Sequence, residues 1–338
     1  MGSEEARGRF QKEADVLSVQ QLEKLANYML VEHFDSLVAQ FVECFEDYCR
    51  QITKMQQASE KGELGYISFS MLRTDILAKD YRLRIDAYDE RWYQDRVECV
   101  GLYDVSDLCV FLDEFSTMLV EERKKYVYKV SPADVAQIVL KESDRYRNAI
   151  MELVRLALVQ AVKSPVYKEI LRAEHFAITF GEFQDASAIV HKEDRREKDA
   201  KEVKKLLEEK RDNGHEYEFF ENLDLTNGKY KNIKLAYSSG AGSDFSNSDL
   251  TNAVMFFCKF PKATFNSVKL QNSVLMGIDF DGVTMENVDF EDSRLLKLSF
   301  KNSTLINIDF TKAKSVADIN LENTTLINTT LPTELVVE

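Results

Sequence analysis

The residues best suited to chemistry in this chain lie in one short charged segment. Arg82, Arg84 and Asp86 alternate with apolar residues over 81–88, and the only tryptophan, Trp92, follows shortly after. Such alternation is typical of a β-strand, so the three charged side chains share one face. Two guanidinium groups on one face can hold an anion or a carboxylate through paired hydrogen bonds. The segment is therefore interpreted either as a ligand or anion site or as a solvated strand face with ion pairs.

The sequence predicts no catalytic residue, metal site or cofactor. It contains no HExxH, GxSxG, GxGxxG or P-loop motif, and its four histidines are scattered. The five cysteines lack CxxC spacing, which indicates reduced core thiols of a cytosolic protein. An enzymatic or ligand-binding activity in the N-terminal domain stays open; a deep pocket around residues 82–92 with convergent polar groups would support it.

Charge and hydropathy limit the classes of partner. The net charge of −14 argues against direct binding of nucleic acid or of an anionic membrane. The first 15 residues are charged and lack the apolar core of a signal peptide, and no apolar run is long enough to span a membrane. We expect a cytoplasmic bacterial protein; export by another route, as a secreted effector, stays an alternative.

The first part of the chain predicts a mainly helical domain with a small strand element. We expect residues 1–15 to be flexible because they are charged, and 16–190 to form the domain. The spacing of apolar residues predicts helices within 32–61, 106–119 and 131–162, and strands at 66–70, 81–88 and 175–180.

A period of five residues organises the chain from Phe220 onward. Of the 20 positions taken in fives from 220 to 315, 18 hold Phe, Leu, Met or Tyr, and only Gly240 and Ser315 do not. One extra residue then shifts the phase, which Leu321 resumes. The residue two places before each position is small or apolar almost throughout. A fixed repeat of this length indicates a stacked architecture in which two residues of every five point inward.

This pattern resembles the pentapeptide-repeat proteins, whose consensus is A(D/N)LXX. The segments TNAVM, PKATF and KNSTL stand close to that consensus, and the resemblance covers residues 216–331. It implies a right-handed quadrilateral β-helix over 214–331 that closes one coil with every four repeats. The expected fold is thus a mainly helical N-terminal domain followed by a β-helical solenoid and a short tail, 332–338.

Residues 191–213 carry charges of both signs and lie between the two domains. Its large apolar residues are only Val203, Leu206 and Leu207. The segment is interpreted as an exposed linker helix, or as a helix whose apolar residues cover the open end of the solenoid.

Six acidic residues and no basic residue lie between Gly277 and Ser293. We expect these acids to form a negative belt around most of one coil; they are Asp279, Asp281, Glu286, Asp289, Glu291 and Asp292. The gyrase-protecting members of the family are thought to imitate DNA with an acidic prism, so the resemblance implies a type II topoisomerase as one alternative partner. Ordinary solubilising charge is the other interpretation.

A second irregular feature is the segment from Ser238 to Gly242. Gly240 occupies an inward position without a side chain to fill it, so we expect a bulge or a loose coil that exposes Ser239, Gly240 and Gly242 as partner-binding residues. The count of five continues across it, so the bulge must be short.

These features together predict a non-enzymatic scaffold that binds another protein through a rigid prism. Family members often dimerise through the C-terminal coil, which implies a homodimer here. A coil capped within the monomer is the alternative.

Overall fold

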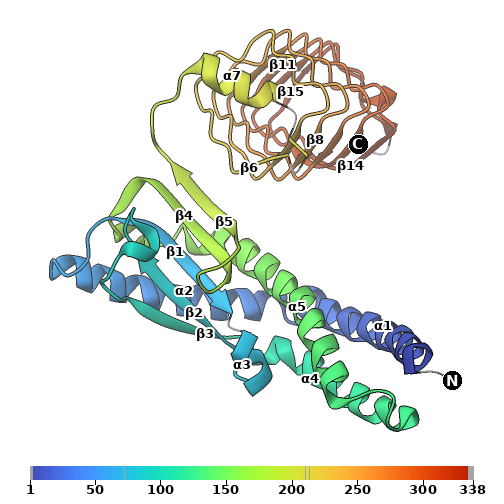
Figure 1. Cartoon of the computed structure of the whole chain (residues 1–338). Coiled ribbons are helices and arrows are strands. Elements are labelled where there is room, and N and C mark those ends of the chain that lie inside the picture. Colours follow the sequence, from blue (N-terminus) through green and yellow to red (C-terminus); the bar gives the residue numbers. More distant parts are fainter. Residues whose placement is uncertain (1–2, 72, 210, 213, 334–338) are drawn as a thin grey trace. The chain divides into compact units, whose positions relative to one another are not determined.

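The computed structural model describes residues 3–71, 73–209, 211–212 and 214–333. The chain divides into two compact units, Met1–Arg195 and Arg196–Glu338, which are described separately (Figure 1). No helix among the described residues is long and apolar enough to cross a membrane. The five cysteines are free thiols; Cys44 is half-buried and the other four are buried.

The first unit combines long helices with a five-stranded sheet. Its helices are α1 (Ser3–Asn27), α2 (Phe34–Gln57), α3 (Arg73–Ala78), α4 (Ser106–Arg123), α5 (Pro132–Ala161) and α6 (Pro165–Glu169), and a π-helical turn, Tyr28–Glu32, follows α1. Its strands are β1 (Leu64–Met71), β2 (Arg82–Tyr88), β3 (Val100–Asp104), β4 (Arg172–Glu182) and β5 (Ser187–Asp194).

The sheet is mixed and has the strand order β3-β2-β1-β4-β5. Strands β1 and β4 run parallel, and the other neighbouring pairs are antiparallel. The three predicted strands form its centre. The two edge strands, β3 and β5, were not predicted, so the strand element is larger than the sequence suggested.

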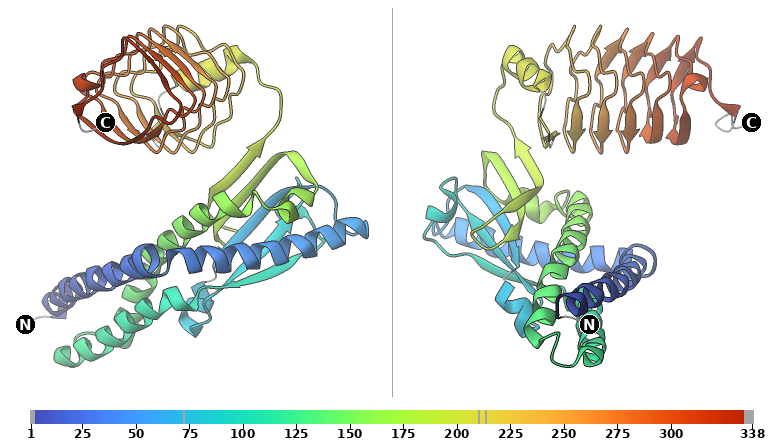
Figure 2. Two further views of the ribbon diagram at one scale, coloured as in Figure 1. Left: turned by 180° about the vertical axis from the view of Figure 1, so that it is seen from behind. Right: turned by 45° about the vertical axis from the view of Figure 1, so that its right-hand side comes forward.

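One face of the sheet supports the core of this unit. Phe69 of β1 lies against Phe41 and Phe45 of α2, with ring centroids 5.6 and 6.2 Å apart. Alternate residues of the neighbouring strands, such as Ile85 and Ile178, are buried in the same cluster. The helices α1 and α4 and part of α5 extend beyond the sheet, as Figure 2 shows.

The expectation of a flexible N-terminal segment was wrong for residues 3–15, and residues 1 and 2 lie outside the described residues. Helix α1 already begins at Ser3, and Ala6, Phe10 and Ala14 are fully buried. The ring of Phe10 contacts the edge of Tyr126 with centroids 5.7 Å apart. These three apolar residues recur every fourth position, but the charged residues between them hide the pattern.

The charged segment 191–213 is not one helix. Residues 191–194 belong to β5, which Ile189 and Val190 already anchor in the sheet, and α7 spans only Ala200–Glu208. Asp199 begins α7 by accepting hydrogen bonds from the backbone N–H groups of residues 201 and 202. Val203 and Leu207 of α7 are buried with the apolar interior of the second unit.

The second unit is a four-sided β-solenoid of about six turns, as the repeat predicted (Figure 2). Its strands are β6 (His215–Glu216), β7 (Lys234–Ala236), β8 (Val254–Phe256), β9 (Thr264–Asn266), β10 (Val274–Met276), β11 (Thr284–Glu286), β12 (Arg294–Ser299), β13 (Thr304–Ile306), β14 (Ser315–Asn320) and β15 (Thr325–Ile327). One side is the parallel sheet β14-β12-β10-β8-β7-β6, and another is β15-β13-β11-β9.

The coils repeat every 20 residues, so equivalent residues lie directly above one another. Val274 pairs with Val254 on one neighbour and with Arg294 on the other. The two remaining sides are joined by isolated bridges, for example Lys259 with Asp279 and Lys269 with Asp289.

Aromatic rings fill the interior, and asparagines turn the corners. Phe260, Phe280 and Phe300 stack with centroids 5.7 and 5.3 Å apart. Many corners place Asn at positive φ, where this residue is tolerated better than most, and side chains of equivalent residues bond across coils, as in Asn252 to Asn232 at 2.9 Å.

The expected bulge at Gly240 is absent from the described residues 238–242. The backbone N–H of Gly240 donates to the carbonyl of Lys259 at 2.9 Å, in the regular pattern of the coils. The space that a larger side chain would take is filled by the rings of Phe220 and Phe260, whose centroids lie 6.4 Å apart. Gly240 is therefore required by its neighbours, and the coil around it is tight.

The phase slip lies in the turn before β14. Residues 294 and 315 pair across a separation of 21 instead of 20, and the short 3-10 turn Phe310–Lys312 takes up the extra residue. The inward position after Phe310 is therefore Val316, which explains why Ser315 interrupted the count of five.

We predict that Gly240→Ala destabilises the second unit by about 1–3 kcal/mol. An added Cβ would stand 2.5 Å from the Phe220 ring and 3.0 Å from the Phe260 ring. Urea unfolding gives the free energy. The neighbouring Ala241→Ser, at a half-buried outward position, should change it by less than about 0.5 kcal/mol. Equal stabilities of the two variants would contradict this packing.

Candidate functional site

The arginines of the predicted ligand cluster are paired with carboxylates of their own segment. Arg84 donates to both carboxylate oxygens of Asp86, with Nε–Oδ2 and Nη2–Oδ1 distances of 2.8 Å. Arg82 bonds Asp80 in the same way. The hydrogen bond to Asp86 raises the pKa of Arg84. The structure thus places Arg82, Arg84 and Asp86 on one strand face, as predicted, and satisfies them locally.

Trp92 belongs to a cluster of half-buried aromatic rings beside this face. Its ring centroid lies 3.7 Å from that of Tyr66, 5.1 Å from Tyr93 and 6.1 Å from Tyr88. Rings at these separations touch one another, so they leave no space for a ligand between them. Trp92 is one anchor that holds the segment 89–99 against the sheet.

A buried ion pair is the second anchor of this segment, and no sequence pattern pointed to it. Lys61 Nζ lies 2.6 Å from Asp95 Oδ2, and both side chains are almost fully buried. The Asp95 carboxylate also accepts the backbone N–H groups of Asp89 and Val97, each at 2.9 Å. Burial by itself would raise the pKa of Asp95, but Lys61 and these N–H groups outweigh it and lower the pKa below its usual value.

Tyr167, Arg172 and Glu193 form another polar cluster, where α6 meets strands β4 and β5. Tyr167 Oη donates to Glu193 Oε1 at 2.6 Å, and Arg172 Nε donates to Oε2 at 3.1 Å. Arg172 also lies over the Tyr167 ring. Burial would raise the pKa of Glu193, but His191, Tyr167 and Arg172 lower it to about 2. These residues bond one another, and their bonds join α6, β4 and β5.

A groove of about 460 Å³ lies between α2 and β3. Cys44, Tyr48 and Gly101 line it together with Glu43 and Asp47. It includes none of Arg82, Arg84, Asp86 or Trp92, so it is not the pocket that would support an activity at that segment. Among the described residues, no group of three or more His, Cys, Asp or Glu side chains is placed to hold a metal ion.

The six acids of the predicted belt are divided among three sides and a corner of the solenoid. Asp279 and Asp281 lie on one side, Glu286 on the next, Asp289 and Glu291 on the third, and Asp292 at a corner.

Two of these acids stabilise turns. Asp279 Oδ1 accepts the N–H of Asp281 at 2.9 Å, and Asp289 Oδ1 accepts that of Glu291 at 3.0 Å. Asp224, Asp244, Asp249 and Asp309 make the same bond elsewhere. Burial raises the pKa of Asp279. Asp279 and Asp289 therefore have a structural role that is independent of any partner.

The residues predicted to form a binding bulge lie within a regular coil. Ser239 is buried and donates a hydrogen bond to Glu221 at 2.6 Å. Gly242 has a φ of +66°, which fits a corner position. Neither Ser239 nor Gly240 projects from the solenoid.

Sequence reasoning missed an apolar side on the sheet β14-β12-β10-β8-β7-β6. Outward positions there carry apolar residues that are half-buried or exposed; they are Ala236, Tyr237, Val254, Phe256, Phe257, Val274, Met276 and Leu296. We call these residues the apolar side. Reading outward residues every 20 positions, instead of the inward ones every five, would have found it.

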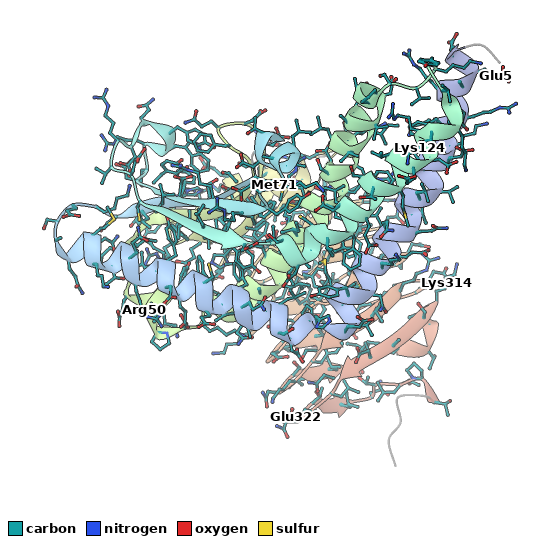
Figure 3. The ribbon with its side chains drawn as sticks, turned by 90° about the horizontal axis from the view of Figure 1, so that it is seen from below. Glu5, Arg50, Met71, Lys124, Lys314 and Glu322 are labelled. Carbon is teal, nitrogen blue, oxygen red and sulfur yellow. The ribbon has the colours of Figure 1, made fainter. Side chains whose placement is uncertain are left out.

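The two ends of the solenoid differ. Helix α7 covers the first coil, where the side chain of Glu208 also accepts the backbone N–H of Lys229 at 3.0 Å. In the last coil that the described residues form, Leu326 is 39% exposed and Ile327 is 48% exposed. Figure 3 shows Lys314 and Glu322 at the margin of this coil, where Glu322 pairs with Lys301 at 2.9 Å.

The second unit is a four-sided β-solenoid, and part of its sequence matches a known repeat family. Residues 258–295 match the family model for pentapeptide repeats, in eight copies, and the C-terminal unit is a pentapeptide-repeat solenoid. A comparison with curated protein sequences finds no significant match.

Parts of three solved structures are similar to part of this chain. HetL, a pentapeptide repeat protein involved in heterocyst differentiation regulation from the cyanobacterium Nostoc sp. strain PCC 7120, has 16% identity and a TM-score of 0.19, over 28% of this chain and 42% of HetL. QnrB1, a plasmid-mediated fluoroquinolone resistance protein, has 14% identity and a TM-score of 0.23, over 35% of this chain and 82% of QnrB1. Rfr23 from the cyanobacterium Cyanothece 51142 has 15% identity and a TM-score of 0.22, over 37% of this chain and 88% of Rfr23.

We predict that Lys61→Met destabilises the first unit by about 3–5 kcal/mol, because it leaves the Asp95 carboxylate buried without its cation. Adding Asp95→Asn should restore more than half of the loss. The matched control is Lys79→Met, which breaks an exposed pair with Asp113 and should cost less than about 1 kcal/mol. Urea unfolding measures all three; equal losses for Lys61→Met and Lys79→Met would contradict the assignment.

We predict that Glu193 makes the first unit sensitive to acid. Its pKa falls from 4.5 to about 2 on folding, so its contribution is present above pH 4.5 and is lost as the pH falls toward 2. Glu193→Gln should be less stable at pH 7 and should show a shallower loss of stability across that window. Glu152→Gln, which removes an exposed carboxylate, is the matched control for the loss of one negative charge. Parallel profiles of Glu193→Gln and wild type would contradict the prediction.

Proposed function

We propose that this chain is a non-enzymatic protein-interaction scaffold whose solenoid joins a second copy through its C-terminal end. The observation that supports the proposal is the exposure of Leu326. The equivalent inward residues of the preceding coils, Met285 and Leu305, are fully buried, whereas Leu326 is 39% exposed. Burying a leucine contributes roughly 1.5–3 kcal/mol, so the last coil gains stability from being covered.

The edge of the last coil supports a twofold arrangement of two copies. Strand β14 pairs with β12, and β15 pairs with β13. Each is the last strand of its sheet, so its other edge has no neighbouring strand among the described residues. A twofold axis through the end of the stack would pair these free edges antiparallel with those of the other copy. The apolar residues Val316, Leu321 and Leu331, which are half-buried, would then be covered as well.

The other end of the solenoid could not associate in this way. Helix α7 already covers its apolar interior with Val203 and Leu207. One closed and one open end yield a dimer and not a filament, because only one end can pair. Such a dimer would display the sides of two rigid prisms for further partners. We also propose a cytoplasmic location, which the five free thiols support.

We predict that the wild-type chain is a dimer of twice 39.0 kDa in solution and that Leu326→Glu is a monomer. A charge at this position would be buried without a partner in the dimer. Light scattering coupled to size exclusion measures the mass. Thr264→Glu, which adds the same charge at a half-buried outward position in the middle of the stack, should remain dimeric.

A second variant separates loss of association from loss of folding. Ile327→Lys changes an outward residue that is 48% exposed, and its circular dichroism should match the wild type while its mass is halved. A wild-type chain that is monomeric at every concentration would overturn the proposed self-association.

A further inference from the structure

We propose that the apolar side of the solenoid binds an amphipathic helix of another protein, and that acidic residues flank the apolar stripe of this helix. The inference goes beyond self-association, because the apolar side lies along the stack and not at its end. It assigns to the chain a second interaction surface and the chemistry of the partner that fits it.

The fold does not require apolar residues at these positions. Most equivalent outward residues of the sheet β15-β13-β11-β9 in the same coils are polar, as Thr264, Asn266 and Thr284 show, and Ile306 is the apolar exception. On the apolar side the outward residues are Val254, Phe256, Val274 and Met276. Contiguous exposed apolar residues without a role in packing mark an interaction surface.

A stack of aromatic rings shapes one border of the apolar side. Tyr217, Tyr237 and Phe257 lie above one another at a corner, with centroids 5.2 and 5.5 Å apart and nearly parallel planes. The next corner residue is Gly277, where a Cβ would stand 2.6 Å from the Phe257 ring. The ring of Phe257, which is 42% exposed, is therefore held in place before any partner arrives. A rigid aromatic anchor of this kind loses little entropy on binding.

The dimensions of the apolar side fit one helix. It extends over four coils, from Ala236 to Leu296, and three intervals of about 4.8 Å give a length of about 14 Å. A helix with its side chains is about 10–12 Å wide. A larger globular partner commonly buries about 800 Å² on each side of its interface, which an area of this length cannot supply.

Cations flank the apolar side at both ends. Lys234 lies beside Val254 in the preceding coil, and Arg294 lies beside Val274 in the following coil. Lys297 occupies the corner position equivalent to Gly277, one coil later. All three cations are exposed. The acid Asp292 also borders the apolar side, at the corner before Arg294, and the acids Glu216 and Asp318 stand one coil further out. Complementary charge therefore favours acidic residues beside the apolar stripe of the partner.

The same charges disfavour a second copy as the occupant. Two copies meeting face to face would bring the cations at the ends of one apolar side against those of the other. Like charges facing each other across an interface disfavour association, whereas an acidic helix meets opposite charge at both ends.

Two labelled synthetic peptides test the proposal against the full chain. Both are 18 residues long with the same leucine stripe, and one has glutamates and the other lysines beside the stripe. Fluorescence anisotropy should show saturable binding of the glutamate peptide and at least tenfold weaker binding of the lysine peptide. No saturable binding of the glutamate peptide, or equal affinity for the two peptides, would overturn the proposal.

Variants locate the binding and test its charge preference. Met276→Glu should weaken binding of the glutamate peptide at least tenfold, whereas Thr284→Glu on the sheet β15-β13-β11-β9 should leave it unchanged. The double variant Arg294→Glu, Lys297→Glu should reverse the preference toward the lysine peptide. Unchanged binding by Met276→Glu, or an unchanged preference in the double variant, contradicts the assignment. None of these variants lies at the C-terminal end, so each should still form the proposed dimer. The mass of each variant in solution therefore tests the proposed self-association separately from peptide binding.

Discussion

The solenoid depends on the contact between inward side chains of neighbouring coils. Each coil has two inward residues in every five, and they are buried only if another coil stands above and below them. Phe280 is fully buried between Phe260 and Phe300, with centroid distances of 5.7 and 5.3 Å, whereas Leu326 in the last coil is 39% exposed. No coil is stable alone, so the ends of the stack decide how the domain behaves. One end is covered by α7 of the same chain, and at the other end Leu326 and Ile327 are partly exposed.

The sequence predicted the solenoid well because its repeat is local and strict. Two other expectations failed, one in the solenoid and one in the first unit, because each depends on contacts between residues far apart in the sequence. A gap was predicted at Gly240 because the five-residue repeat carries no information about contacts between neighbouring coils. The rings of Phe220 and Phe260, in the coils above and below, fill this space. The edge strand β5 was missed because charged residues at its end, such as Lys192 and Glu193, masked its apolar start. Long-range pairing in the sheet decided both β3 and β5, and propensity alone could not find it.

The candidate sites were harder to predict because surface residues serve both folding and binding. Arg84 and Asp86 share a strand face as expected, but they bond each other. Asp279 and Asp289 read as part of a binding belt, whereas each bonds the backbone of its own turn. The apolar side escaped notice because its residues follow one another at intervals of 20, and only the stacking of coils brings Phe256, Met276 and Leu296 together.

Hydrogen exchange measured along the solenoid at several protein concentrations tests the central claim most directly. If stacking holds the coils and the C-terminal end is open, amides in β8 to β13 exchange slowest at every concentration. Amides of β14 and β15 exchange faster in dilute protein and gain protection as the concentration rises. Protection of the last coil equal to that of the middle coils in the most dilute sample would contradict the account.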